Sequence, residues 1–347
     1  MNYKTTEKLP FKHIKLLGHG AYGIVDEVTY SGISKAPSRV FARKVILVIR
    51  GRGITVLENF RQVSINRRLR HPHTTSLLWT YEVVTKKETV REVGMVISPV
   101  AQLNLAEFLE LYEQDETTQT THEMEIKRHL RHKDIKPTNI LIKDDTILIA
   151  DFGFSKVFSD ETTETKSTAG PKTPSYCAPE VAAHLPRNRA SDIFSLGCVF
   201  AELTTVLAGH KISDFDEMRG PPGARAFQLT PDTTLAWLVN LAHQLIENRD
   251  SMYPAVEPVR WTWLMLNLKQ ELRIGADRLA RRIEASRKWS LVGFECEVHA
   301  DSLSVPSGPH HQEIIKIDYI SWLDSIEGRN GVGEDLVQPS WDIELRV

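Results

Sequence analysis

The chain has 347 residues with 41% hydrophobic and 25% charged residues, which is the composition of a globular protein. No stretch approaches the 18 or more apolar residues of a membrane-spanning helix, and the first residues lack the apolar core of a secretory signal, so we expect neither membrane insertion nor secretion. The cysteines, Cys177, Cys198 and Cys296, are spaced too unevenly for a disulfide framework or a metal cluster, which favours a cytoplasmic or nuclear location.

The formal net charge of -2 conceals an uneven distribution along the chain. Residues 1–97 hold 17 Lys and Arg against 7 Asp and Glu, whereas residues 298–347 hold 9 acidic and 3 basic residues. Two interpretations stay open: both ends are solvated surfaces, or the acidic end folds back on the basic one. The basic residues alternate with apolar runs rather than gathering in one block, so we do not expect nucleic-acid binding.

The first 98 residues predict a small, sheet-rich lobe. β-Branched and aromatic runs separated by turn residues indicate five strands, at 11–17, 23–30, 40–49, 77–84 and 90–97. One helix is expected between Glu58 and Arg70, where apolar residues recur at helical spacing until Pro72 stops the helix.

From Leu105 onward the apolar periodicity is mainly helical. The segments that carry it are 104–112, 190–205, 233–248, 260–268 and 276–285. We therefore predict a first lobe over residues 1–98 and a larger second lobe over residues 99–297. An acidic tail over residues 298–347, where the periodicity fades, should be partly ordered.

A glycine-rich segment, Gly18-His-Gly20-Ala-Tyr-Gly23, lies between the first two predicted strands. Glycines at such a hairpin tip let backbone amides approach phosphate oxygens, whereas the dinucleotide-binding motif needs a helix directly afterwards. Alone, the segment also fits an ordinary glycine-rich turn. On the next strand Ala42 and Lys44 share one face, because side chains alternate along a strand. Lys44 therefore points where the glycines point, although a surface lysine on an edge strand is the other explanation.

Three further motifs follow along the chain. A His-x-Asp-x-Lys-x-x-Asn segment occupies residues 132–139, and a pair of short apolar strands separates it from Asp-Phe-Gly at residues 151–153. Ala-Pro-Glu follows at residues 178–180. Each motif is short, but their order and separations make the combination highly specific.

Together these motifs resemble the eukaryotic-type protein kinase family, and the resemblance runs from about residue 11 to residue 284. It implies an α+β, bilobal fold, with a small five-stranded antiparallel lobe carrying one helix and a larger, mainly helical lobe. It also implies that Arg273 pairs with the carboxylate of Glu180 in the Ala-Pro-Glu segment.

The resemblance also implies roles for individual residues in phosphoryl transfer, which needs mainly positioning and charge neutralisation. Asp134 would orient and deprotonate the attacking hydroxyl, Lys136 would lie beside the transferred group, and Lys44 would hold the α- and β-phosphates. Mg²⁺ would be held by Asn139 and Asp151. The residues implied to contact the nucleotide are Gly18, Gly20, Gly23, Val25, Ala42, Lys44, Ala101, Asn139 and Asp151.

The implied cofactors are ATP and Mg²⁺, and the implied partner is a protein substrate. The Asp-x-Lys spacing and Thr173, three residues before Tyr176, are similar to members that act on serine and threonine. Ser98 aligns with the position that controls access behind the adenine. Phosphorylation at Ser167 or Thr168 is a further hypothesis for activation.

Several positions depart from the family pattern. Gln62 stands where the glutamate partner of Lys44 is expected, and a charge pair at 4 Å is worth about 4 kcal/mol at an effective dielectric near 20. Asn66, Thr74 and Thr75 replace apolar residues, which costs about 1 to 3 kcal/mol for each buried polar group without a partner. The alternative is that these positions are simply better hydrated in this chain. Otherwise we expect Lys44 to be less firmly oriented and turnover to be slower.

The largest departure lies between Leu105 and Asp134, only 29 positions apart. About a dozen residues, or roughly 18 Å of helix, are missing relative to the family pattern. Two explanations stay open: a lost segment, or a domain that no longer needs a rigid catalytic loop. A smaller departure is Lys133, which replaces an arginine and loses its planar, bidentate donor fork.

These observations predict a serine/threonine protein kinase, with transferase activity on MgATP and reduced turnover. The alternative is a pseudokinase-like module that binds nucleotide or a regulatory protein partner, as Gln62 and the shortened segment suggest. A small-molecule kinase is a third class, but the Ala-Pro-Glu segment at residues 178–180 argues against it.

Overall fold

The computed structural model describes residues 2–4, 9–20, 23–30, 40–47, 71–84, 90–112, 130–144, 146–152, 156–157, 174–247 and 256–290. The chain forms two compact units, Met1–Thr165 and Lys166–Val347. The predicted lobe boundary at residues 98 and 99 stays a prediction. The helix predicted at residues 58–70 and the acidic tail at 298–347 lie outside the described residues.

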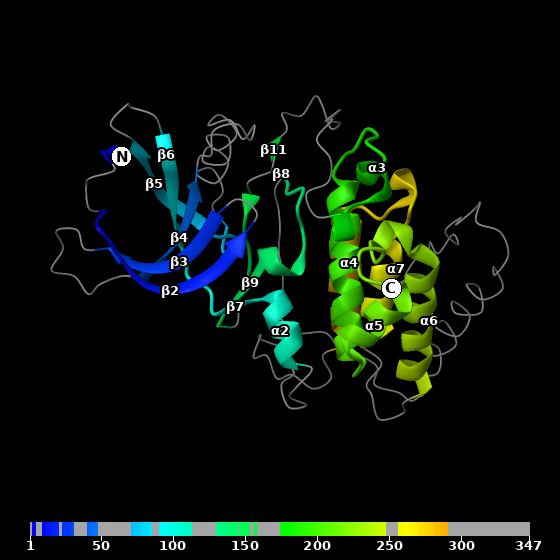
Figure 1. Ribbon diagram of the computed structural model, residues 1–347. Helices are drawn as coiled ribbons and strands as arrows, with labels where there is room; N and C mark the ends of the chain where they lie inside the picture. The colour runs from blue at the N-terminus through cyan, green and yellow to red at the C-terminus, as the bar shows by residue number, and fades with distance from the viewer. Residues whose placement is uncertain are drawn as a thin grey trace, which may run out of the picture. The chain divides into compact units, whose positions relative to one another are not determined.

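The first unit contains a six-stranded sheet (Figure 1). Its strands are β1 (Asn2–Lys4), β2 (Phe11–Gly20), β3 (Gly23–Tyr30), β4 (Val40–Leu47), β5 (Ser76–Val84) and β6 (Val90–Ser98), in the spatial order β1-β5-β6-β4-β3-β2. Strands β2 to β6 pair antiparallel, which confirms the predicted five-stranded lobe. A sixth strand, which the sequence did not predict, is β1, which adds in parallel to the outer edge of β5. Three residues are too few for an alternation pattern to reveal such a strand.

The two faces of this sheet differ in chemistry. On one face Ile46, Leu77 and Met95 form a small buried cluster. On the other, the buried carboxylate of Asp26 accepts hydrogen bonds from Arg43 Nε at 2.9 Å and Nη2 at 2.6 Å. Burial alone would raise the pKa of Asp26, but the hydrogen bonds from Arg43 and His13 hold it below its usual value. The aromatic side chains that surround this pair are Phe11, Tyr30, Phe41, Trp79 and Tyr81.

The rest of the described part of the first unit holds a three-stranded sheet, a two-stranded sheet and short helical segments. Its elements are β7 (Leu103–Asn104), α2 (Leu105–Tyr112), β8 (Leu130–Arg131), η1 (Pro137–Asn139), β9 (Ile140–Lys143), β10 (Thr146–Ile149) and β11 (Lys156–Val157). Helix α2 begins with a reciprocal cap: Asn104 Oδ1 accepts from the amides of Ala106 and Glu107, and Glu107 accepts from the Asn104 amide. Strands β9 and β10 form the apolar hairpin predicted before Asp151.

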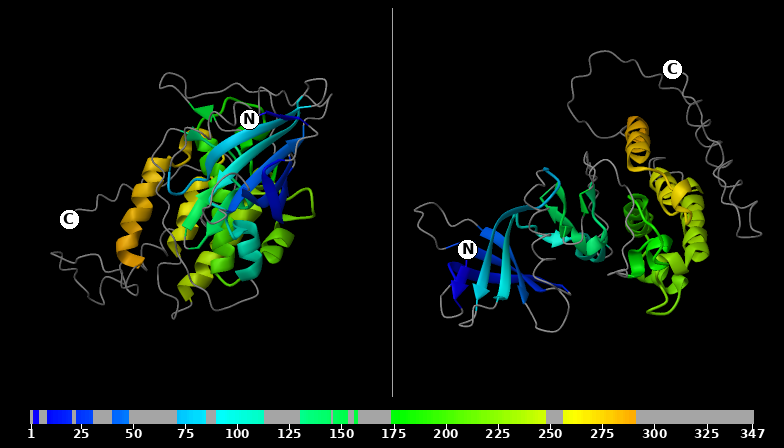
Figure 2. Two further views of the ribbon diagram at one scale, coloured as in Figure 1. Left: turned by 90° about the vertical axis from the view of Figure 1, so that its left-hand side faces the viewer. Right: turned by 90° about the horizontal axis from the view of Figure 1, so that it is seen from above.

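The second unit is helical, as predicted. Its elements are η3 (Pro174–Tyr176), α3 (Pro179–Ala182), α4 (Ala190–Leu207), α5 (Ile212–Arg219), η4 (Phe227–Leu229), α6 (Pro231–Glu247), α7 (Val256–Met265), η6 (Gln270–Leu272) and α8 (Ala276–Ser290). Helix α4 packs against α6 and α7 (Figures 1 and 2). A Cβ added at Gly197 would lie 2.7 Å from Met265 Cβ, so this glycine permits the close approach of α4 and α7.

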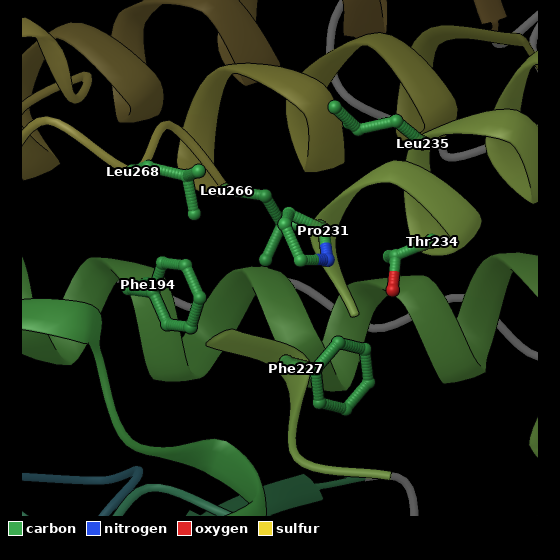
Figure 3. A pocket seen from close by; sticks show the side chains of 7 residues that line it. All are labelled: Phe194, Phe227, Pro231, Thr234, Leu235, Leu266 and Leu268. Carbon is green, nitrogen blue, oxygen red and sulfur yellow. The ribbon is translucent and has the colours of Figure 1, made fainter. Parts of the chain in front are cut away.

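Two features of α4 follow from its central position. It is 18 residues long with a mean hydropathy of 1.4, enough by composition to cross a bilayer, but 67% of it is buried inside the protein. Its apolarity therefore serves the core. Beside it lies an open apolar hollow whose lining includes Phe194, Phe227, Leu266 and the buried Thr234 (Figure 3). No residue predicted to contact nucleotide lines this hollow.

The predicted pair between Arg273 and Glu180 is present. Arg273 Nη1 donates to Glu180 Oε1 at 2.8 Å, and Nη2 donates to Oε2 at 3.1 Å. Both side chains are buried, so the bidentate geometry compensates for their desolvation. Arg273 Nη1 also donates to the Ala190 carbonyl, which ties this pair to the start of α4.

A second buried carboxyl lies on α4. Glu202 accepts a hydrogen bond from the Tyr176 hydroxyl at 2.7 Å, and Ser195 Oγ donates to the Tyr176 carbonyl at 2.8 Å. Burial raises the pKa of Glu202 to about 7. Burial also raises the pKa of the Tyr176 phenol, so the phenol remains the donor across neutral pH.

A first prediction concerns Gly94 on β6. A Cβ at this position would overlap the ring of Tyr81, which is 1% exposed and has no room to move. Gly94→Ala should lower the free energy of unfolding by about 1 to 3 kcal/mol, measured by urea titration. Gly275→Ala is the control, because no atom lies within 4 Å of a Cβ built there. Equal effects of the two substitutions would contradict the packing described for Tyr81.

A second prediction concerns the pH dependence of stability. As pH rises from about 4.5 to about 7, Glu202 loses its proton in the unfolded chain but keeps it in the folded one, so stability should fall over this window. Glu202→Gln keeps an acceptor for Tyr176 but has no proton to lose. Relative to the wild type it should therefore gain about 3 kcal/mol of stability between pH 4.5 and pH 7.5, measured by urea titration.

The matched control for this comparison is Glu217→Gln, because Glu217 is an exposed acid on α5. The free energy of unfolding of Glu217→Gln should follow that of the wild type at every pH. Parallel pH profiles for the wild type and Glu202→Gln would show that the Glu202 carboxyl is not held protonated by its surroundings.

Candidate functional site

The glycine-rich segment forms the turn of the β2–β3 hairpin, as predicted. Its described part ends in the pair Gly20 and Gly23, and Ala21 and Tyr22 lie outside the described residues. Gly23 has φ +153°, and a Cβ there would overlap the carbonyl oxygen of Val45. Only glycine therefore fits at this position, where β3 begins beside β4.

The sheet register places three predicted site residues in one row. Gly18 pairs with Val25 across β2 and β3, and Val25 pairs with Lys44 across β3 and β4. Residues directly opposite one another share a face of the sheet, so Gly18, Val25 and Lys44 lie on the same face. Ala42, two residues before Lys44, lies on that face as well.

Lys44 pairs with Asp151, 107 residues further along the chain. Lys44 Nζ donates to Asp151 Oδ1 at 2.7 Å, and the two side chains are 13% and 27% exposed. Asp151 has φ +60°, a conformation that costs a residue with a side chain about 1 to 3 kcal/mol unless its surroundings hold it. The predicted phosphate-binding lysine and metal-binding aspartate thus meet within the first unit.

Asp134, Lys136 and Asn139 form the second part of the site. Pro137 opens the short η1 helix and holds Lys136 in an extended conformation, since the residue before a proline avoids the helical region. Asp134 Oδ2 then receives two donors, Lys136 Nζ at 3.0 Å and Asn139 Nδ2 at 3.0 Å. Asn139 Nδ2 also donates to the Asp134 carbonyl at 2.7 Å. Two donors fix the orientation of a carboxylate that is 9% exposed.

His132 connects the two parts of the site. Its Nε2 donates to the Ala150 carbonyl at 2.8 Å, and its Nδ1 accepts from the Asp134 amide at 3.3 Å. Its ring packs edge-on against Phe152 with centroids 4.9 Å apart. The Ala150 amide in turn donates to the Asn139 carbonyl at 2.9 Å. The segment of Asp134 and Asn139 is therefore hydrogen-bonded to the residue before Asp151.

The oxygen atoms of Asn139 and Asp151 are of the kind that binds Mg²⁺. Among the described residues, no group of three or more His, Cys, Asp or Glu side chains could hold a metal ion. Asn139 turns its amide nitrogen to Asp134, so its carboxamide oxygen is the atom that would bind a metal, and Asp151 would supply a carboxylate. Mg²⁺ typically binds one or two such oxygens together with water and substrate phosphates.

Other site predictions are placed but not tested by these contacts. Ser98 ends β6, and Ala101 lies half-buried before β7. Contact of either residue with a nucleotide stays a prediction. Gln62, Asn66 and the candidate phosphorylation sites lie outside the described residues, as does most of the shortened segment after α2.

The predicted cost of Thr74 does not arise. Its hydroxyl donates to the His71 carbonyl at 3.1 Å, so the buried group has a partner. Sequence reasoning also missed His73, whose Nδ1 contacts the Ile147 carbonyl at 2.9 Å, and the pair of Tyr176 with Glu202. The sequence offered one signal for the second contact: Glu202 is a polar residue inside an apolar helical run.

A third prediction separates the site's ion pair from a surface pair. Lys44→Met removes the donor at 2.7 Å from the partly buried Asp151 carboxylate and should lower the free energy of unfolding by about 1 to 3 kcal/mol. Lys143→Met is the control, because its 2.8 Å pair with Asp144 is solvent-exposed and should change stability by no measurable amount. Urea titration of both variants checks this, and equal effects would contradict the burial described for Lys44.

The comparisons with known proteins agree with this geometry. The family model for the protein kinase domain matches residues 11–218. Serine/threonine-protein kinase 36 of Pongo abelii is 32% identical over 204 residues, which are 55% of this chain and 14% of the relative. Serine/threonine-protein kinase fused of Drosophila melanogaster is 28% identical over 263 residues, 67% of this chain and 31% of the relative. The chain thus spans less than a third of the length of these relatives. It belongs to the protein kinase family.

Proposed function

We propose that this chain is a serine/threonine protein kinase that transfers the γ-phosphoryl group of ATP to a hydroxyl group of a protein. The observation that carries this proposal is the pairing of Asp134 with Lys136 and Asn139 in the same unit as the Lys44–Asp151 pair. The names of the relatives support the same chemistry.

In this proposal the Asp134 carboxylate accepts the proton of the attacking hydroxyl. The hydroxyl oxygen then forms a bond to the γ-phosphorus as the bond to the β-phosphate oxygen breaks, and ADP leaves with that electron pair. Lys136 lies 3.0 Å from Asp134 and neutralises charge on the transferred group. Because Asn139 also holds Asp134, the base stays in one orientation throughout.

Lys44 and the glycine hairpin bind the nucleotide. The Gly18–Val25–Lys44 row places the Lys44 ammonium group on the face of the sheet that it shares with Gly18, where it suits phosphate oxygens. Asn139 and Asp151 would hold Mg²⁺, which would supply positive charge to neutralise the phosphates. When a nucleotide binds, the Lys44 ammonium group would interact with both Asp151 and the phosphates.

Turnover in this proposal is slower than in kinases with a glutamate at the position of Gln62. An amide offers Lys44 only a dipole, so less of its orientation is fixed before the nucleotide binds. Each 1.4 kcal/mol of lost transition-state stabilisation lowers the rate about tenfold.

The test is phosphate transfer from MgATP to a generic protein substrate by the purified chain. Asp134→Asn should abolish transfer to serine and threonine, because an amide cannot accept the proton, while nucleotide binding persists. Asp144→Asn is the control, because Asp144 is exposed and bonded to Gln102 and Lys143, and it should leave the rate unchanged.

Equal transfer by the wild type and Asp134→Asn would refute the proposal. Thermal stabilisation of the wild type by MgATP without any transfer would instead assign this chain a nucleotide-binding role without catalysis.

A further inference from the structure

Strand β10 ends at Ile149, two residues before Asp151, and has a different partner on each of its edges. On one side β10 pairs with β9. On its other edge Thr74 forms a parallel bridge with Ile149: the Ile149 amide donates to the His73 carbonyl at 2.9 Å, and the Thr75 amide donates to the Ile149 carbonyl at 3.2 Å. Residues 73–75 thus act as a very short added strand.

This parallel ladder does not continue through the backbone. Its next bond would run from the His73 amide to the Ile147 carbonyl. That amide instead donates to the Nδ1 atom of His71 at 3.1 Å, because the chain turns at Pro72. Without a substitute, the Ile147 carbonyl would lose its ladder partner on this edge.

The His73 side chain supplies the missing donor. Its Nδ1 lies 2.9 Å from the Ile147 carbonyl oxygen. A carbonyl oxygen only accepts, so Nδ1 carries the hydrogen in this contact. One residue therefore holds β10 at two points, through its carbonyl at Ile149 and through its ring at Ile147.

The position of this clamp gives it a functional meaning. Asp151 lies two residues after Ile149 and has φ +60°, a conformation that its surroundings must hold. Ala150, which lies between Ile149 and Asp151, is already held on both sides. Its amide donates to the Asn139 carbonyl, and its carbonyl accepts from His132 Nε2. The two bonds from His73 fix the strand that leads into this segment.

We propose that His73 is a positioning residue for Asp151, acting through β10 rather than by touching nucleotide, metal or substrate. The functional part of this inference rests on the proposed role of Asp151 as a Mg²⁺ ligand. The structural part, that the His73 donor orders β10 and the segment up to Asp151, stands without it.

Two substitutions of nearly equal shape isolate the donor. In His73→Asn the amide nitrogen lies near the place of Nδ1 and can donate to Ile147, so this variant should behave as the wild type. In His73→Asp the same place holds a carboxylate oxygen, which accepts only and faces the carbonyl oxygen. His73→Ala, which removes the donor without adding charge, serves if the aspartate variant does not fold.

The first readout is amide hydrogen exchange of the peptide that spans residues 146–151. Exchange should be about three- to tenfold faster in His73→Asp than in the wild type, because one hydrogen bond is lost. In His73→Asn the exchange rate should be unchanged. Tyr81→Phe is the matched control, because it removes a comparable bond, from Tyr81 to Glu92, inside the six-stranded sheet. It should leave exchange at residues 146–151 unchanged.

The second readout is Mg²⁺-dependent binding of ADP, measured by calorimetry, with the KM for MgATP and kcat alongside. His73→Asp should weaken the Mg²⁺-dependent part of binding by about three- to tenfold and raise KM, and His73→Asn should restore both. If the asparagine and aspartate variants behave alike in exchange and binding, the inference is wrong.

Failure of the proposed function gives a different pattern. In that case the wild type shows no phosphate transfer, while the exchange difference between His73→Asn and His73→Asp still decides whether the donor orders β10. Faster exchange with unaltered Mg²⁺-dependent binding would overturn the positioning role of His73.

Discussion

The ion pair between Lys44 and Asp151 connects the six-stranded sheet and the three-stranded sheet of the first unit. Lys44 comes from the middle of β4 in the six-stranded sheet, and Asp151 follows β10 at the edge of the smaller sheet. A contact between residues 107 positions apart holds only if each end is fixed by its own surroundings. The proposed chemistry depends on this pair, because phosphates and Mg²⁺ would meet where these two charges meet.

Each end of the pair is fixed in a different way. Lys44 is fixed by sheet register, which places it in one row with Val25 and Gly18. Asp151 is held through the strand and residue before it: the His73 and His132 rings donate to the Ile147 and Ala150 carbonyls, and the Ala150 amide donates to the Asn139 carbonyl. A sheet supports its residues cooperatively, whereas part of the support before Asp151 comes from the single side-chain bonds of His73 and His132. The segment that would hold Mg²⁺ is therefore the more sensitive of the two to substitution.

The second unit stabilises its own core in a comparable way. Arg273 and Glu180 form a buried bidentate pair, and Glu202 receives the Tyr176 hydroxyl. Both interactions attach the Ala-Pro-Glu region to α4, the central helix of that unit. Buried polar groups of this kind contribute little net stability but strongly disfavour other arrangements of the same elements.

Much of this architecture could be predicted from the sequence. Strand alternation placed Ala42 and Lys44 on one face, and the resemblance to protein kinases implied that Arg273 and Glu180 form a pair. Local patterns could not reveal β1, which has three residues, or the role of His73, which depends on a turn at Pro72 and on a strand 74 positions away. The expected penalty at Thr74 failed for the same reason, since its partner is a backbone carbonyl and leaves no trace in the side-chain pattern.

The most direct measurement of the central claim is calorimetric titration of ATP, with and without Mg²⁺, into the wild type, Lys44→Met and Asp151→Asn. If Lys44 and Asp151 bind the same nucleotide, Lys44→Met should weaken ATP binding both with and without Mg²⁺. Asp151→Asn should abolish the gain in affinity that Mg²⁺ confers. Mg²⁺-independent affinity in the wild type, or a full Mg²⁺ effect in Asp151→Asn, would contradict this account.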